Sequence, residues 1–309
     1  MWFEKKGLDW VIPPVEAQVR ALELPEGKID MVLDTDTFNE VDDQFALAYA
    51  LLSPERLNVE AIYAAPFYNS RSTGAKDGME KSYQEIQRLL GKMNRTENVL
   101  RGSDAFLQES GYVDSPAARD LVERAMARAD GERLYVVAIG AITNVASAIL
   151  MEPKICEKIA VVWLGGHPTS YPTALEFNLS QDVRAARIVL DCGCPLTLVP
   201  CLGVASHLLT SVQELSACIG GKNPLCDALV ELFAAYSDDH FAWAKEIWDV
   251  STIAYLINPE WVPTKIVHSP LLTDDSHWAH DENRHLIREA YFCRRNPIFR
   301  DLFEKLARA

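Results

Sequence analysis

Short apolar runs alternate with amphipathic stretches along most of the chain. Apolar runs without polar alternation are typical of strands buried on both faces, and they cover Ile29–Leu33, Val59–Tyr63, Leu134–Ile139, Ile159–Leu164 and Leu196–Val199. The stretches between these runs have a helical apolar period, at Asp42–Leu52, Met79–Leu90, Ser115–Ala129, Thr143–Leu150 and Asp182–Asp191. This alternation predicts an α/β fold, with an open, mostly parallel, Rossmann-like sheet and helices on both faces.

The remainder of the chain continues with helices and a strand and shows no sign of a second domain. It is more helical from Ser211 to Ile257, and a short β run at Thr264–His268 precedes a polar C-terminal helix. Because the sequence has no internal repeat, low-complexity tract or Gly/Ser linker, we expect one domain over residues 1–309. Ligands of such folds bind at the carboxyl ends of the strands. The residues that follow each apolar run are therefore the candidate functional residues.

Composition and charge argue against several classes of protein. The chain has 309 residues, and 49% of them are hydrophobic. We expect no transmembrane helix, because no apolar stretch approaches about 20 residues. A net charge of −14 argues against general nucleic-acid binding and against anionic membranes. The opening MWFEKKGLDW lacks an apolar signal region, and the 7 cysteines suit a reducing compartment, so we expect a cytoplasmic protein.

An acidic cluster follows the first predicted strand. Its carboxylates are those of Asp34, Asp36, Glu40, Asp42 and Asp43. Carboxylates this close repel one another unless a cation compensates their charge, and hard oxygen ligands suit Ca²⁺ or Mg²⁺. The alternative interpretation is a solvated acidic turn in which Asp42 caps the next helix.

The same segment also permits a different chemistry. Asp34-Thr35-Asp36 matches the Asp-x-Asp nucleophile of Mg²⁺-dependent phosphohydrolases, in which Asp34 or Asp36 would attack phosphorus. Against this hypothesis, no later strand run ends in an acidic pair with a preceding lysine, and Asp42 and Asp43 would have no role. Phosphate release that depends on Mg²⁺ would discriminate this class of enzyme.

Three further polar segments follow later runs. Gly140–Ala146 offers free backbone carbonyls where a helix begins. Glu176 and Asn178 alternate with apolar neighbours, which predicts an extended segment with both side chains on one side, and a carboxylate beside an amide suits sugar hydroxyls. Trp248 and Asp249 precede an apolar helix. Taken singly, these segments are also typical of a helix cap, an edge strand and a core aromatic.

In this order and spacing, the acidic cluster and the three later segments resemble the nucleoside hydrolase family, the ribonucleoside N-glycohydrolases of inosine-uridine preferring type. The resemblance runs from about Ile29 to Glu260. It implies Ca²⁺-dependent hydrolysis of ribonucleosides to ribose and free base, in purine and pyrimidine salvage. It also implies a homo-oligomer, either a dimer or a tetramer.

The resemblance also implies roles for individual residues. It gives Asp36, Asp43, Asp249 and the backbone carbonyl of Thr143 as Ca²⁺ ligands, and Asp36 as the base that activates a metal-bound water. Ribose hydroxyls would be bound by Asp42, Asn69, Glu176 and Asn178, with Asn178 also among the catalytic residues. Trp248 would stack on the departing base, as in the purine-preferring branch.

The chain departs from the family pattern in three places. The loop between Asp36 and Asp42 is two residues longer, which would let Asn39 or Glu40 reach the sugar. Trp248 stands where many members have a histidine that protonates the leaving group. Ser170, with His167 nearby, lies where a sugar-binding asparagine is expected. These departures leave a second hypothesis open, namely a catalytically degenerate member that only binds a ribosyl ligand.

Some other residues are interpreted as structural or left without a role. Cys192, Cys194 and Cys201 lack the histidine spacing of a metal site and are expected to be packing residues. Trp163 lies in a predicted buried strand and is expected in the core. A second aromatic that would stack on a base is sought among Phe38, Phe67, Tyr68 and Trp243.

Overall fold

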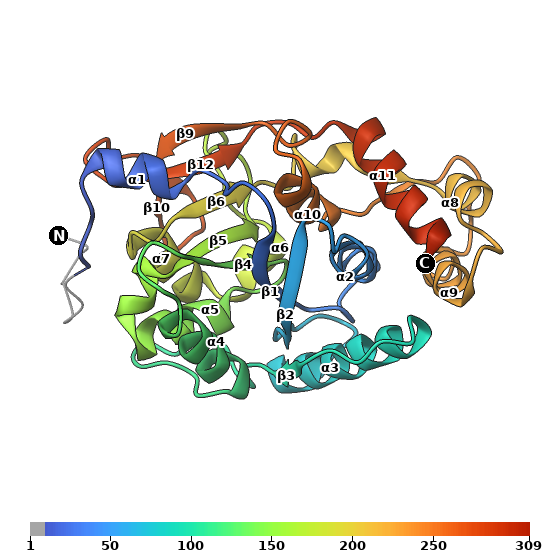
Figure 1. Cartoon of the computed structure of the whole chain (residues 1–309), viewed down its shortest axis with the longest axis horizontal. Coiled ribbons are helices and arrows are strands. Elements are labelled where there is room, and N and C mark those ends of the chain that lie inside the picture. The colour runs from blue at the N-terminus through green and yellow to red at the C-terminus, as the bar shows by residue number, and fades with distance from the viewer. Residues whose placement is uncertain (1–9) are drawn as a thin grey trace.

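An eight-stranded sheet forms the centre of the computed structural model, which describes residues 10–309 (Figure 1). The strand order is β3-β2-β1-β4-β5-β6-β12-β9. The strands are β1 (Ile29–Thr35), β2 (Leu57–Ala64), β3 (Val99–Arg101), β4 (Leu134–Ala138), β5 (Ile159–Leu164), β6 (Leu196–Val199), β9 (Thr264–His268) and β12 (Leu286–Ala290). All neighbours are parallel except β12 and β9, which are antiparallel. The predicted α/β fold with a mostly parallel sheet is confirmed.

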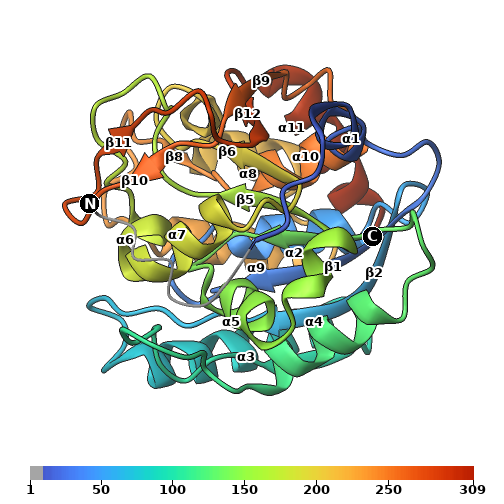
Figure 2. The same cartoon turned by 90° about the vertical axis from the view of Figure 1, so that its left-hand side faces the viewer.

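Helices surround this sheet in both views (Figures 1 and 2). They are α1 (Val15–Ala21), α2 (Asp43–Leu51), α3 (Ala75–Lys92), α4 (Pro116–Met126), α5 (Thr143–Met151), α6 (Phe177–Gln181), α7 (Val183–Asp191), α8 (Val212–Cys218), α9 (Pro224–Ala234), α10 (Val250–Ile257) and α11 (Arg295–Arg308). Two 3₁₀ segments are η1 (Pro153–Glu157) and η2 (Ala205–His207). Two small antiparallel pairs join β7 (Leu209–Thr210) to β8 (Lys245–Glu246) and β10 (Leu271–Leu272) to β11 (Trp278–Ala279).

The central strands are apolar throughout because both faces of the sheet are covered. In β1, Met31 and Leu33 face a hydrophobic cluster shared with α2, α10 and α11, whereas Val32 faces a second cluster shared with α4, α5 and α7. The same alternation places Trp163 of β5 in the second cluster, fully buried as expected. A strand with two apolar faces reads as a continuous apolar run, and this is why the sequence pattern located the strands.

The structure corrects one local prediction. Glu176 is extended, but the extended conformation ends there, because Glu176 is the N-cap residue of α6, which begins at Phe177. The carboxylate of Glu176 accepts hydrogen bonds from the backbone N–H groups of Asn178 and Leu179. The carboxylate thus binds backbone N–H groups that have no partner within the first turn of the helix. The alternation of polar and apolar residues in the sequence could not reveal this start of a helix.

The strand order reverses at β1. From β1 the chain adds β2 and β3 on one side and β4, β5 and β6 on the other. Such a reversal leaves a crevice at the carboxyl ends of the central strands, where ligands bind in open α/β sheets. None of the helices in residues 10–309 has the length and apolar character needed to cross a bilayer. The opening segment, on which the prediction about secretion rests, lies almost entirely outside the described residues.

Candidate active site at the strand ends

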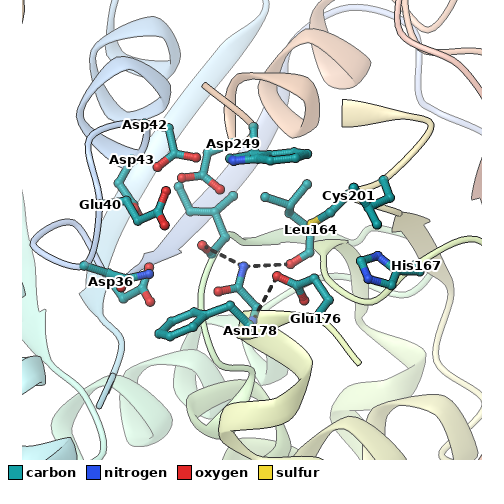
Figure 3. Close-up of a pocket in the computed structure, with 15 residues that line it drawn as sticks. Asp36, Glu40, Asp42, Asp43, Leu164, His167, Glu176, Asn178, Cys201 and Asp249 are labelled. Carbon is teal, nitrogen blue, oxygen red and sulfur yellow. Dashed lines mark hydrogen bonds between the residues drawn. The ribbon is translucent and has the colours of Figure 1, made fainter. Parts of the chain in front are cut away.

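A cavity of about 270 Å³ opens at the carboxyl ends of β1, β4, β5 and β6 (Figure 3). It is lined by Asp36, Asn39, Glu40, Asp42, Asp43, Ile139, Leu164, His167, Glu176, Phe177, Asn178, Cys201, Leu202, Trp248 and Asp249. Six of these residues are carboxylic acids, and none of the described lining residues is lysine or arginine. The wall of the cavity is therefore strongly acidic.

Three aspartates converge where two helices begin. Asp42 and Asp249 are the N-cap residues of α2 and α10, and Asp43 is the first residue of α2. Neither N-cap side chain makes a capping hydrogen bond. Instead, carboxylate oxygens of Asp42, Asp43 and Asp249 lie within 4.8 Å of one another. All three side chains are buried, so the acidic turn is not solvated. Asp42 does stand at the N-cap position of α2, as the alternative interpretation expected, but its side chain does not cap the helix.

Asp36 lies beside this group without any protein partner. Both of its carboxylate oxygens are buried and make no hydrogen bond. Gly140 permits this arrangement, because a Cβ at that position would lie 2.9 Å from Cγ of Asp36. The glycine that opens the segment after β4 is thus required by the close approach of an acidic side chain.

Burial and mutual repulsion disfavour the charged forms of these acids. Burial, followed by the charges of Asp43 and Asp42, holds the pKa of Asp36 well above its usual range. Burial raises the pKa of Asp43 to about 8 and, together with the charge of Glu40, that of Asp42 to about 6. Burial also holds the pKa of Asp249 well above its usual range. Four buried carboxylates, with both oxygens of Asp36 lacking a hydrogen-bond partner, fit a hard divalent cation, which would compensate their charge.

Supporting contacts fix this end of the site. The hydroxyl of Thr35 donates to Asp43. Asn144, at the start of α5, donates to Asp34 over 2.7 Å and accepts from the backbone N–H of Ser103 over 2.7 Å. Asp34 is fully buried and is not among the lining residues. It joins β1 to α5, whereas Asp36 faces the cavity.

Glu176 and Asn178 form the opposite side of the cavity (Figure 3). Besides capping α6, Glu176 accepts from the N–H of Gly166 over 2.8 Å. Asn178 donates its side-chain N–H groups to the carbonyls of Ile139 and Leu164 at 3.3 and 3.1 Å. These bonds use both amide hydrogens and leave its Oδ1 available to a ligand.

The structure separates the remaining predicted residues into two groups. Asn39 and Trp248 line the cavity, as expected of substrate-binding residues. Asn69 does not line it, and its amide donates to Oδ1 of Asn39 over 2.6 Å. Thr143 is the first residue of α5, is absent from the lining, and donates its hydroxyl to Asp182 over 2.8 Å. Its role as a backbone ligand stays a prediction.

Of the two residues noted where a sugar-binding asparagine is expected, His167 lines the cavity, whereas Ser170 is exposed and does not. Phe177 also lines the cavity and was missed by sequence reasoning. Phe177 is thus an aromatic wall that the search among Phe38, Phe67, Tyr68 and Trp243 did not include, and none of those four lines the cavity. The signal that could have identified these residues as lining the cavity is their position in the sequence, because they follow β5.

The three cysteines expected to be packing residues are all buried in the hydrophobic clusters, namely Cys192, Cys194 and Cys201. Cys201 in addition lines the cavity just after β6. Burial and then the nearby charge of Glu176 raise the pKa of its thiol well above the usual range, so the thiol stays protonated. Its place directly after a strand was the signal that could have found it.

Comparisons with known proteins agree with this geometry. The model of a family described as inosine-uridine preferring nucleoside hydrolase matches residues 31–289. A pyrimidine-specific ribonucleoside hydrolase, RihA of Escherichia coli O9:H4 (strain HS), is 29% identical over 265 residues, which span 75% of this chain and 80% of that protein.

Solved structures share the fold. The plant nucleoside hydrolase PpNRh1 superposes with a TM-score of 0.69 at 18% identity, covering 92% of this chain and 100% of that chain. A purine-preferring ribonucleoside hydrolase from Gardnerella vaginalis gives 0.68 at 20% identity, covering 90% and 98%. An inosine-guanosine nucleoside hydrolase gives 0.71 at 17% identity, again covering 90% and 98%. At these identities the likeness is one of fold.

Proposed function

The chain belongs to the inosine-uridine preferring nucleoside hydrolase family, and on that premise we propose that it hydrolyses the N-glycosidic bond of ribonucleosides to ribose and free base. The observation that carries the proposal is the pairing of two groups across one cavity. Four buried aspartates, of which Asp36 has no hydrogen-bond partner, lie on one side, and Glu176 and Asn178 lie on the other. A ribose needs both acceptors and donors for its hydroxyls, and its anomeric carbon needs an activated water.

Asp36, Asp43 and Asp249 would hold a divalent cation, and we propose Ca²⁺ because hard carboxylate oxygens in a flexible arrangement suit it. The backbone carbonyl of Thr143 is the fourth proposed ligand. When bound, the cation supplies a lowered pKa and a fixed direction of attack for water. The carboxylate of Asp36 accepts the proton from the attacking water. Its two oxygens have no other protein partner, so one remains free for this task.

Residues on both sides of the cavity bind the sugar. At the acidic side, the carboxylate of Asp42 accepts from ribose hydroxyls and the side-chain amide N–H of Asn39 donates to them. At the other side, the carboxylate of Glu176 and Oδ1 of Asn178 accept from them. As the bond from the anomeric carbon to nitrogen breaks, positive charge develops on the sugar ring. Carboxylate and amide oxygens already fixed by the protein stabilise that charge without reorganising. The carbonyls of Ile139 and Leu164 fix the amide of Asn178 in this way.

Trp248 would stack on the departing base. It is half-buried, packs against the hydrophobic cluster of α2 and α10, and still lines the cavity. A rigid aromatic face binds a planar base without selecting its hydrogen-bonding groups. We propose Phe177 as the second aromatic residue available to the base, because it also lines the cavity.

A binding-only role is the second candidate, and the longer loop Thr37–Val41 favours it, because the loop adds Asn39 and Glu40 to the cavity wall. The Asp-x-Asp phosphohydrolase hypothesis is disfavoured. Asp34 is buried, bonded to Asn144 and absent from the lining, so it could not act on phosphorus. An acidic wall without lysine or arginine also repels phosphate.

The experiment is to measure ribose release from inosine, guanosine, adenosine, cytidine and uridine, with Ca²⁺ and with a chelator. Release that the chelator abolishes and Ca²⁺ restores is the expected result, and the panel ranks the bases. Protein that binds Ca²⁺ but releases no ribose would support the binding-only role. Protein that neither binds a divalent cation nor releases ribose would contradict the proposed site.

A further inference from the structure

The loop Thr37–Val41 is held at several points, although it is longer than the family pattern. Gln44 donates to the carbonyl of Thr37 over 2.6 Å. The guanidinium of Arg71 donates to the carbonyls of Asn39 and Glu40 at 3.3 and 3.4 Å. These bonds fix the backbone of the loop but leave the side chain of Glu40 to find its own partner.

That partner is Lys245 of β8, which lies far away in the sequence. Its ammonium is 2.5 Å from Oε2 of Glu40, and its side chain is only 11% exposed. The ammonium also lies 4.5 Å from the ring centre of Tyr236. The side chain of Glu40 is 34% exposed, so solvent reaches the carboxylate more than the ammonium, and loss of the carboxylate would leave a buried charge without its partner.

Lys245 therefore places a buried positive charge against a side chain of a cavity wall that contains no lysine or arginine among its described residues. Its charge also acts on Asp42, because it favours the ionised form of that acid. The pair joins the loop after β1 to the segment that leads into Trp248 and Asp249. It thus connects the two parts of the chain that meet at the cavity.

We propose that Lys245 is a positioning residue of this active site, which holds Glu40 and the loop Thr37–Val41 in the conformation that binds the sugar. The proposal rests on the proposed function, because the bound sugar is that of a nucleoside. Lys245 does not line the cavity, so it acts through Glu40. Losing its charge would free the loop and weaken substrate binding more than it slows the bond-breaking step.

The test compares Lys245→Met with a matched control, Lys305→Met. Lys305 is 16% exposed, pairs with Glu55 and Asp301, and lies 5.2 Å from the ring centre of Tyr49, so its surroundings are similar. It lies on α11, outside the cavity. We expect Lys245→Met to raise KM about tenfold while kcat changes less than about threefold, and Lys305→Met to change neither.

Two further variants separate positioning from general structural support. Lys245→Arg keeps the charge and should restore most of the substrate affinity. In a Glu40→Gln background, Lys245→Met should cause a much smaller loss than it does alone, because the ammonium has already lost its carboxylate partner and only its effect on Asp42 remains. Additive losses, or a KM for Lys245→Met equal to that of Lys305→Met, would overturn the proposal.

Hydrogen exchange of the free protein gives a readout that does not depend on catalysis. Amides of residues 37–41 should exchange about tenfold faster in Lys245→Met than in the wild type or in Lys305→Met. Unchanged exchange would overturn the positioning role even if nucleosides are hydrolysed. If the wild type releases no ribose while exchange responds as expected, the proposed function fails and the loop contact stands.

Discussion

Asn69 donates its side-chain amide to Oδ1 of Asn39 over 2.6 Å, and of these two residues only Asn39 lines the cavity. Asn39 therefore lies at the cavity, and Asn69 contacts Asn39 rather than the cavity itself. The longer loop after β1 supplies the residue that comes between Asn69 and a ligand. We therefore expect Asn69 to orient Asn39, and Asn39 to make the contact with the sugar.

Replacing Asp36 should separate stability from activity. Asp36→Asn keeps the shape of the side chain but removes a buried charge that has no protein partner. We expect ribose release to fall by at least about 10³-fold, because the base is lost. With a chelator present, the melting temperature should stay the same or rise, because mutual repulsion of carboxylates decreases.

The control for this prediction is Asp275→Asn, the same change at a side chain that is 77% exposed. It should alter neither ribose release nor the melting temperature. Wild-type activity in Asp36→Asn would remove Asp36 from the role of base.

Calcium should stabilise the folded protein. A ligand that binds only the native state at a hundred times its Kd adds about 2.7 kcal/mol to the free energy of unfolding. Thermal melts with Ca²⁺ and with a chelator measure this difference. Asp249→Asn should show a much smaller increase, because one of the converging carboxylates is lost. Identical melting curves of the wild type in both buffers would contradict the proposed metal site.

The base preference should depend on Trp248. Trp248→Ala removes an aromatic face from the cavity wall, and stacking on a base is worth about 1 to 3 kcal/mol. A purine offers the larger ring system, so kcat/KM for inosine should fall more than kcat/KM for uridine. Equal losses for both nucleosides would argue against stacking.

Acid should destabilise the protein through His285. This side chain is buried, and its Nε2 has no hydrogen-bond partner. Burial, with smaller contributions from the charges of Arg284 and His268, lowers its pKa from 6.5 to about 4. The unfolded chain therefore binds a proton at a higher pH than the native chain. The stabilising contribution is complete above about pH 6.5 and is lost as the pH falls towards 4.

The measurement is urea unfolding in chelator at about pH 7.5 and about pH 4.5. His285→Gln should reduce the loss of unfolding free energy between these two conditions by about 2 to 3 kcal/mol. His280→Gln, at an exposed position, serves as the control and should change the loss little. An equal loss in the wild type and in His285→Gln would show that this histidine is not the group responsible.

The sheet could be predicted from sequence because its central strands are apolar on both faces. The run Ile159–Leu164 coincides with β5, and Leu196–Val199 with β6. β12 could not be found in this way, because its residues Leu286–Ala290 mix charged and apolar side chains near the edge of the sheet. A strand is therefore harder to recognise from its sequence when other elements do not cover both of its faces equally.

The acidic side of the cavity was also predictable, because Asp36, Asp42 and Asp43 follow directly after a strand. The contacts between residues far apart in the sequence were not predictable. Nothing local to Asn69 indicates that Asn39 would come between it and the cavity, and nothing local to Lys245 indicates a carboxylate partner from the first loop. Such pairings depend on the path of the loop and on tertiary packing, which periodicity does not encode.

The convergence of Asp43 and Asp249 also affects the order of folding. The two side chains lie far apart in the sequence and meet only when α10 packs against α2. During synthesis, the segment that carries Asp43 emerges long before the one that carries Asp249, so the two carboxylates cannot repel each other until both segments have been made. Docking of α10 on α2 closes this long loop and brings the two carboxylates together. The supply of a cation at that stage would thus decide how readily the last helices dock.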